Sequence, residues 1–246
     1  MPDILFPDFR YYKLDRDQVR IQDGHLVSVH AGLPAQRRAN TDILQAVITL
    51  LRYEPDEQDP DRSRQRWTNA MIWSWYNWLP DYFFQAPASG THKYHPRWAD
   101  RPDGLLLHSL TVCRIAASLC DLIDIGPKDY NALIFAGLHH DMFKYGDLDR
   151  YEDGAMTIHE HPVLGGDFFR LPEVRKQMAN MNISGSECGS IADLISCHAG
   201  PYRTSKYSEI KLPECTSRDQ KLLYKADYIA SRKEDHWVKD LMAVIP

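Results

Sequence analysis

The chain has 246 residues, of which 43% are hydrophobic, enough for one large domain or for a core with an added segment. Its formal net charge of −5 excludes a protein that coats long nucleic acid through bulk charge, because such binding needs many Lys and Arg on phosphates. The N-terminus is too charged for a signal peptide and no apolar run approaches the length of a membrane span, so we expect a soluble, cytoplasmic protein.

The first part of the chain is predicted to be an N-terminal extension, residues 1–60, that packs on a core formed by residues 61–246. Residues 1–38 mix Pro, Gly and charge with short β-like pieces, so we expect an irregular arm in which a hairpin can form. Apolar residues at helical spacing predict a helix over 42–53. The acidic, proline-bearing stretch 54–61 predicts a loop.

An aromatic-rich helix is predicted over residues 64–79, ending before Pro80. The favoured interpretation is a core helix or a dimer face, because most aromatic stripes simply pack; a base-stacking platform is the weaker alternative. A loop over 86–96 follows, with two histidines and a lysine.

The rest of the chain is predicted to be helical. One helix is expected over 105–123 with Asp103 as its cap, and another over 129–143. Further helices are expected near 158–170, 172–180, 187–198 and 217–233. Few convincing strands follow residue 40, so the predicted body is all-α.

The cysteines predict no metal or disulfide framework. They are odd in number and contain no CxxC or zinc-ribbon spacing: Cys113, Cys120, Cys188, Cys197 and Cys215. We therefore predict reduced thiols that are mostly buried.

Polar residues at buried positions of several predicted helices carry the chemical signal. His140 lies on the inward face of its predicted helix, directly before Asp141. His108 is embedded among leucines, and Asp227 shares a helix face with Leu223. A buried His or Asp is costly alone, and a divalent metal compensates both. Each residue by itself is more often a hydrogen-bonded core histidine or a salt-bridged aspartate, whereas the joint pattern is typical of metal sites in helical bundles.

In this order the residues resemble the signature of HD-domain proteins, which is a histidine, a His-Asp doublet and a distal aspartate. His108 matches the first histidine, His140 and Asp141 match the doublet, and Asp227 matches the last residue. The resemblance covers about residues 86–233 and implies an all-α HD-domain helical bundle with an irregular N-terminal extension.

The chain also resembles the HD proteins that bind two metals, whose two additional histidines correspond to His161 and His198. Lys144 matches the lysine that commonly follows the doublet, although Phe143 replaces the usual glycine before it. His139 competes with His140, but the doublet requires the residue directly before the aspartate. His159 competes with His161, which the following Pro and Gly favour, so His159 lies behind the ligands or faces solvent.

The approach to the first histidine is similar to that of HD-type 3′-5′ exoribonucleases and HD-type conjugative relaxases. In those families a histidine-rich stretch is followed closely by Gly-Leu-Leu and the ligand. Here residues 97–101 separate the two features.

The resemblance implies two divalent transition metals on six ligands, with Asp141 bridging and acting in catalysis. The nitrogen-rich ligand set favours Mn, Fe, Ni, Co or Zn over Mg. The implied reaction is cleavage of a nucleotide or nucleic-acid phosphoester by a metal-activated hydroxide, with Lys144 as the catalytic cation. Weaker candidates for binding further phosphates are Lys93, His95, Arg114, Arg203 and Lys206, the last two of which fit a solvated loop equally well.

Two other functions stay open. A few HD-fold proteins resembling myo-inositol oxygenase use the same six ligands for a di-iron site that activates O₂. A non-catalytic HD module that binds a nucleotide or a partner is disfavoured because all six ligands are present. Lys144 and the approach to His108 favour phosphoryl chemistry. The expected partner is a nucleotide or a short single-stranded nucleic-acid end, without a membrane, and a homo-oligomer is left open.

Overall fold

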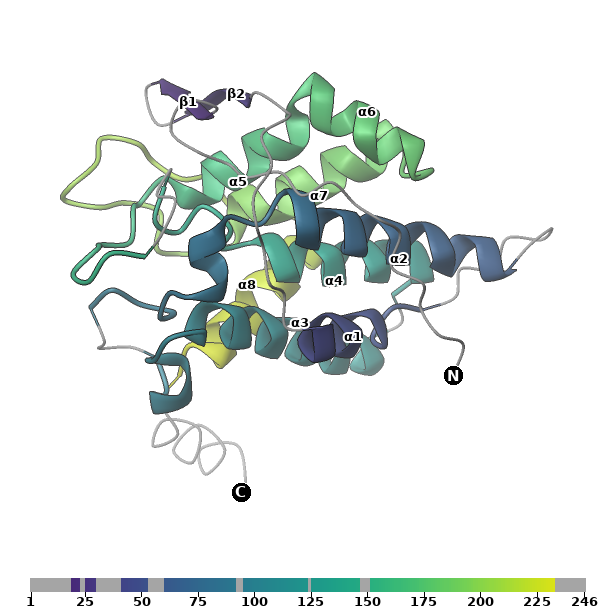
Figure 1. The fold of residues 1–246 in the computed structure, drawn as a ribbon, viewed down its shortest axis with the longest axis horizontal. Helices are drawn as coiled ribbons and strands as arrows, with labels where there is room; N and C mark the ends of the chain where they lie inside the picture. Colours follow the sequence, from purple (N-terminus) through teal and green to yellow (C-terminus); the bar gives the residue numbers. More distant parts are fainter. Residues whose placement is uncertain are drawn as a thin grey trace.

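The computed structural model describes residues 19–22, 25–29, 41–52, 60–91, 95–123, 125–146 and 151–232. Within these ranges the body is helical, as predicted (Figure 1). The elements are β1 (Val19–Gln22), β2 (His25–Val29), α1 (Thr41–Ile48), α2 (Pro60–Asn77), the short 3-10 helices η1 (Asp81–Phe84) and η2 (Arg97–Ala99), α3 (Gly104–Leu122), α4 (Pro127–His139), α5 (His161–Arg170), α6 (Pro172–Asn180), α7 (Gly185–Cys197) and α8 (Arg218–Ala230).

The N-terminal segment contains the hairpin that its β-like pieces suggested. Strands β1 and β2 pair antiparallel, with an irregularity in register between Arg20 and Ile21. The hairpin lies beside α5, above it in Figure 1. The remainder of the predicted arm lies outside the described residues. So does most of the predicted loop 54–61, whose last residues Pro60 and Asp61 instead begin α2, because proline suits the first helical position.

The aromatic-rich helix packs inside the protein. Trp67 and Trp75 of α2 are fully buried, and the ring of Trp67 lies 5.9 Å from that of Phe135 in α4. Trp78, just after α2, packs edge-on against Phe168 of α5 at 5.5 Å. The core interpretation of this stripe is therefore confirmed, and these rings are not a base-stacking platform.

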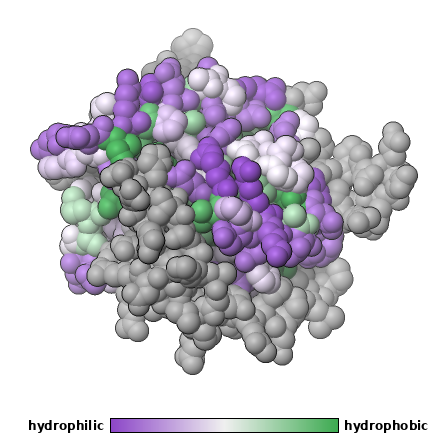
Figure 2. All heavy atoms as spheres, turned by 90° about the horizontal axis from the view of Figure 1, so that it is seen from above, coloured by the Kyte–Doolittle hydropathy of each residue, from purple (hydrophilic) through white to green (hydrophobic). Residues whose placement is uncertain are grey.

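The described part of one face of the molecule is correspondingly polar. Seen from above, the described residues are mostly hydrophilic, with apolar residues in small separate spots (Figure 2).

All five cysteines are free, and four of them are buried, with Cys215 half-buried. The prediction of reduced, mostly buried thiols is confirmed.

Helix α3 is the apolar centre of the bundle. It packs against α4 and α8. Among the described helices it is the one long and apolar enough to cross a membrane by length and composition, so the prediction that no run approaches that length is wrong. Because 56% of its apolar window is buried inside the protein, its hydropathy is that of a core helix.

Several predicted helix ends differ from the structure, including that of α1, which ends at Ile48 and not at residue 53. Asp103 stands at the N-cap of α3, but its φ is 68° and its side chain makes no cap hydrogen bond, since the carboxylate instead accepts from Arg101 at 3.2 Å. Helix α4 ends at His139, before the predicted end at residue 143. Residues 140–146 form a tight turn, in which the amide of Lys144 donates to the carbonyl of Asp141 at 3.0 Å. His140 and Asp141 therefore stand on a turn at the end of α4.

The start of α7 has a capping box, and an ion pair joins the same residue, Glu187, to α2. Ser184 caps α7, accepting from the amide of Glu187 at 3.3 Å while the Glu187 carboxylate accepts from the amide of Ser184 at 2.7 Å. The guanidinium of Arg66 in α2 lies 2.8 Å from the same carboxylate. Glu187 is 4% exposed, so this contact orients α7 against the core.

We predict that Glu187→Gln lowers the free energy of unfolding by about 1–3 kcal/mol at pH 7, because it removes the negative charge that pairs with Arg66 and weakens the cap. Burial opposes ionisation of Glu187, but the hydrogen bonds from Ser184 and the Arg66 ion pair lower its pKa below the ordinary 4.5. A lowered pKa stabilises the fold above the unfolded-state pKa and is lost as pH falls through the folded one. Urea unfolding should therefore show a difference that shrinks below about pH 4.5.

The control for this variant is Glu173→Gln, because Glu173 is exposed in the first turn of α6. It should change the unfolding free energy by less than about 0.5 kcal/mol. Equal effects of the two variants would contradict the role given to Glu187.

Candidate metal centre

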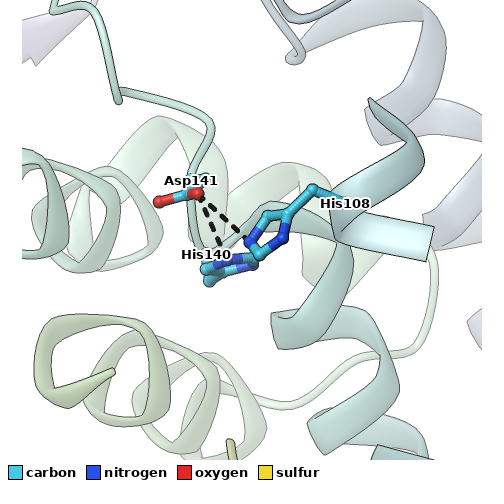
Figure 3. A group of neighbouring side chains, drawn as sticks. All are labelled: His108, His140 and Asp141. Atoms are coloured by element: carbon cyan, nitrogen blue, oxygen red, sulfur yellow. Dashed lines mark ion pairs between the residues drawn. The ribbon is translucent and has the colours of Figure 1, made fainter. Parts of the chain in front are cut away.

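Six side chains from five helices meet where α4 ends. One lies within α3, two on the turn after α4, one at the first residue of α5, one directly after α7 and one within α8. They are His108, His140, Asp141, His161, His198 and Asp227. These are the six residues that the sequence proposed as ligands. Figure 3 shows three of them, with the Asp141 carboxylate directed at the rings of His108 and His140.

The Asp141 carboxylate stands between two pairs of imidazoles. Its Oδ2 lies 3.6 Å from Nε2 of His108 and 3.4 Å from Nε2 of His140. Its Oδ1 lies 3.0 Å from Nε2 of His161 and 3.5 Å from Nε2 of His198. Each oxygen of one carboxylate therefore faces a different pair, which is the arrangement of a bridging ligand.

Asp227 completes the side of the cluster that contains His108 and His140. Its Oδ1 lies 3.0 Å from Nε2 of His108 and 3.7 Å from Nε2 of His140. Ligand atoms within 4.8 Å of one another form three overlapping groups: His108, His140 and Asp141; His140, His198 and Asp227; and Asp141, His161 and His198. Each of these groups could hold a metal ion, and two of them include Asp141.

Backbone carbonyls fix the orientation of three of these imidazoles. Each Nδ1 lies at hydrogen-bond distance, 2.8, 2.6 and 2.7 Å respectively, from the carbonyl oxygen three residues earlier, in His140, His161 and His198. A carbonyl only accepts, so each Nδ1 carries the proton. In its neutral form such a ring presents the lone pair of Nε2 to the cluster, as metal-binding histidines do.

The resulting lone pairs need a cation. Nε2 of His161 and Nε2 of His198 face each other at 3.2 Å, although neither neutral ring has a second proton to donate. Nε2 of His140 and both nitrogens of His108 are buried without a hydrogen-bond partner. Buried imidazole lone pairs beside two carboxylates are the donor set of a divalent transition metal, so the residues present fit such an ion.

The charges of the cluster support the same conclusion. Burial lowers the pKa of His140, but the Asp141 and Asp227 carboxylates outweigh it and raise that pKa to about 10. Burial likewise opposes ionisation of Asp141, yet Lys144 and His140 hold its pKa well below the usual range. Without a metal, a proton and an ammonium thus balance the carboxylates, and a bound cation would replace the proton.

Two glycines bring α5 and α7 close enough for His161 and His198 to meet. A Cβ at Gly166 would lie 1.9 Å from Oγ of Ser196, and one at Gly165 would lie 2.7 Å from the Ile195 side chain. A larger residue at either position would force the helices apart. In the sequence, the Pro and Gly after His161 served only to favour it over His159, without this packing reason.

Tyr82 of η1 holds the turn that carries the His-Asp doublet. Its hydroxyl donates to the carbonyl of Met142 at 2.6 Å and lies 3.3 Å from that of Gly146, whose φ is 69°. The ring is fully buried. Tyr82 was not among the predicted site residues, because a tyrosine followed by Phe83 and Phe84 carries no sign that its hydroxyl supports a turn elsewhere in the chain.

Of the predicted cations and phosphate binders, two lie at the cluster. Nζ of Lys144 lies 2.5 Å from Oδ2 of Asp141, and the residue is 8% exposed. His95 is 9% exposed, with its ring centroid 4.9 Å from that of His108. Lys144 therefore lies beside the bridging carboxylate, whereas His95 lies behind a ligand and is buried away from solvent.

The other predicted phosphate binders are not brought to the cluster by any described contact. Arg114 is exposed on α3, six residues after His108. The guanidinium of Arg203 lies 2.8 Å from the Glu214 carboxylate, and Nζ of Lys206 lies 4.7 Å from the ring centroid of Tyr207. Lys93 lies outside the described residues.

The two competing histidines lie elsewhere. His139 is fully buried, stacks on Phe135 at 4.3 Å, and its Nδ1 lies 2.7 Å from the carbonyl oxygen of that residue. Burial lowers the pKa of His139 to about 4, so it is a neutral core residue. Nε2 of His159 lies 3.1 Å from the carbonyl oxygen of Ile210, which connects two loops.

Comparison with known proteins gives one match. A family model described as HD domain matches residues 105–232, about half of the chain, and the match includes all six cluster residues. No curated protein and no solved structure matches the chain. The finer resemblance to exoribonucleases and relaxases therefore stays a prediction.

We predict that Mn²⁺ raises the melting temperature of the protein and that Asp141→Asn abolishes this shift, because the variant removes the charge shared by both halves of the cluster. Ligand at about one hundred times its Kd stabilises a fold by about 2.7 kcal/mol, which is several degrees of melting temperature. Differential scanning fluorimetry with and without EDTA measures it. Asp121→Asn, at an exposed aspartate paired with Arg52, is the matched control and should keep the shift. A full shift in Asp141→Asn would refute the bridging assignment.

Proposed function

We propose that this chain, which belongs to the HD domain family, is a metal-dependent phosphohydrolase that cleaves the phosphoester of a nucleotide or of a single-stranded nucleic-acid end. The observation that carries the proposal is the Asp141 carboxylate, which faces one imidazole pair with each oxygen and has an ammonium group on one of them. A shared carboxylate, buried imidazole lone pairs and an adjacent cation suit phosphoryl transfer.

The cluster residues form two sets of candidate metal ligands that share Asp141. His108, His140, Asp141 and Asp227 would hold one divalent transition metal, and Asp141, His161 and His198 a second. When bound, such ions supply Lewis-acid polarisation of a phosphoryl oxygen and activation of water. The carbonyl bonds to the Nδ1 atoms keep three rings directed at the ions, so little reorganisation is needed during the reaction.

Lys144 supplies a fixed positive charge beside the metal centre. Its buried ammonium lies on the Asp141 oxygen that faces His108 and His140. A buried cation at that position stabilises negative charge that develops on a phosphoryl oxygen, and in a site of low dielectric this effect is large.

Two tyrosines favour a substrate with a base. Tyr224 and Tyr228 are half-buried on α8, three residues before and one after Asp227, with ring centroids 6.0 Å apart. At i and i+4 the two rings are neighbours on α8, and Tyr224, three residues before Asp227, lies on the side of the helix from which Asp227 reaches the cluster. Nζ of Lys225 lies 5.1 Å from the Tyr224 ring. Partly exposed aromatic rings beside cations stack nucleobases, which supports a nucleotide or strand end as substrate.

The oxygenase alternative uses the same six ligands, so the ligands do not exclude it. Lys144 on the bridging carboxylate favours phosphoryl chemistry, because a fixed cation is useful where a dianionic group reacts. The non-catalytic alternative is disfavoured by the complete set of buried lone pairs.

The test is a substrate panel with the Mn²⁺-loaded protein: bis-p-nitrophenyl phosphate, deoxynucleotides, ribonucleotides, cyclic dinucleotides and short labelled oligonucleotides. We expect metal-dependent hydrolysis of at least one member and loss of it in Asp141→Ala. Oxygen uptake by the iron-loaded protein is followed in parallel. Oxygen consumption without cleavage of any phosphoester would replace the hydrolase by the oxygenase, and unchanged hydrolysis in Asp141→Ala would remove the proposed site.

We predict that Lys144→Gln lowers kcat by about 100-fold while the metal stays bound, a loss comparable to removal of one transition-state donor. The variant leaves all six ligands in place and frees an oxygen of Asp141, so metal affinity should not fall. Steady-state kinetics and metal content measure the two effects separately. Lys176→Gln, at an exposed lysine of α6, is the control and should keep kcat. Loss of metal together with activity would show that Lys144 supports the ligands instead.

A further inference from the structure

His95 belongs to the histidine-bearing loop before α3 that the proposed chemistry does not use. Its ring is 9% exposed, packed edge-on against His108 with centroids 4.9 Å apart and planes at 78°. Its Nε2 lies 3.3 Å from Oγ of Ser231, directly after α8. Ser231 in turn lies 3.2 Å from Oδ1 of Asp227. The imidazole thus contacts one candidate ligand and reaches a second through a single hydroxyl.

The direction of these hydrogen bonds follows from which groups can donate a proton and which can only accept one. An ionised carboxylate only accepts, so Ser231 donates its one proton to Asp227. The hydroxyl oxygen must then accept from His95, which places the His95 proton on Nε2. The Asp227 oxygen that receives this bond is also the one that faces His108 and His140, so the chain of bonds ends on a ligand atom.

His108 lacks the support that the other cluster histidines have. Those three donate Nδ1–H to a carbonyl near the end or start of a helix. His108 lies inside α3, where helical hydrogen bonds already use the nearby carbonyls, and its Nδ1 is buried without a partner. Nδ1 of His95 is also buried without a partner.

The two unpartnered atoms are complementary. With its proton on Nε2, His95 has a lone pair on Nδ1. If Nε2 of His108 presents its lone pair to a metal, its proton is on Nδ1. One ring therefore has the donor and its neighbour the acceptor, in rings already in contact.

We propose that His95 is a positioning residue of the metal centre, which orients Asp227 through Ser231 and supplies the hydrogen-bond acceptor that His108 lacks. The inference rests on the metal centre of the proposed function, and it replaces the earlier assignment of His95 to phosphate binding. A partner of this kind raises metal affinity because it fixes the tautomer and orientation of the ligands before the ion arrives.

The test measures metal binding directly, using Co²⁺ and Mn²⁺ with the full-length protein. His95→Phe keeps an aromatic ring and removes both nitrogens, whereas Ser231→Ala removes only the hydroxyl and Ser231→Thr retains it. His159→Phe is the matched control, since His159 is a half-buried histidine bonded to a loop carbonyl. Melting curves in EDTA report folding, chelator competition gives affinities, and the Co²⁺ absorption spectrum reports ligand geometry.

We expect His95→Phe to lower the affinity for one of the bound metal ions by about 10- to 100-fold, as loss of such partners does. It should also change the Co²⁺ absorption spectrum. Ser231→Ala should weaken it less, Ser231→Thr should restore wild-type affinity, and His159→Phe should match the wild type. The double variant His95→Phe/Ser231→Ala should lose less metal-binding free energy than the sum of the two single losses, because both residues act on Asp227.

Wild-type affinity and spectrum in a folded His95→Phe, or equal losses in Ser231→Ala and Ser231→Thr, would overturn the inference while leaving the proposed function intact. Tight metal binding that depends on His95, without hydrolysis of any phosphoester, would support the inference and overturn the function. A wild-type protein that binds neither ion would overturn both.

Discussion

The structure depends on one carboxylate. Asp141 places one oxygen against His108 and His140 and the other against His161 and His198, at 3.0–3.6 Å. These contacts connect α3, the end of α4, the start of α5 and the end of α7. A buried charge of this kind is stable only with compensation, which here comes from Lys144 and a proton, and in the metal-bound protein from cations. The helices are therefore arranged around a charge as much as around an apolar core.

Most ligands stand at helix ends, and this placement has a chemical use. The last carbonyls of a helix have no partner within it, so a histidine in the following turn can donate to one of them. His140 and His198 do so after α4 and α7. The same bond satisfies the helix and directs Nε2 at the metal centre. His108 and Asp227, which lie inside helices, lack this arrangement, and His95 and Ser231 lie where they can support them.

The glycines and Tyr82 show how the rest of the fold serves these few atoms. Gly165 and Gly166 remove side chains that would separate α5 from α7, and the Tyr82 hydroxyl holds the turn after α4. Helix α3 is apolar enough to span a membrane, yet it carries the fully buried His108 toward the charged cluster. Its apolar surroundings lower the local dielectric and so strengthen each electrostatic contact at the site.

The sequence by itself predicted the all-α class and favoured a packed aromatic helix, because helical periodicity is a local signal. Buried polar positions pointed to His108, His140, Asp141 and Asp227, and the resemblance to HD proteins added His161 and His198. The sequence did not determine where α4 ends, how Asp103 bonds, or that His95 lies behind His108. Asp103 bonds locally to Arg101, whereas the turn after α4 and the place of His95 involve contacts between segments far apart in the chain, such as Tyr82 with Met142 and His95 with Ser231. Only the tertiary structure decided them, since a hydrogen-bond partner at long sequence separation leaves no pattern in either segment alone.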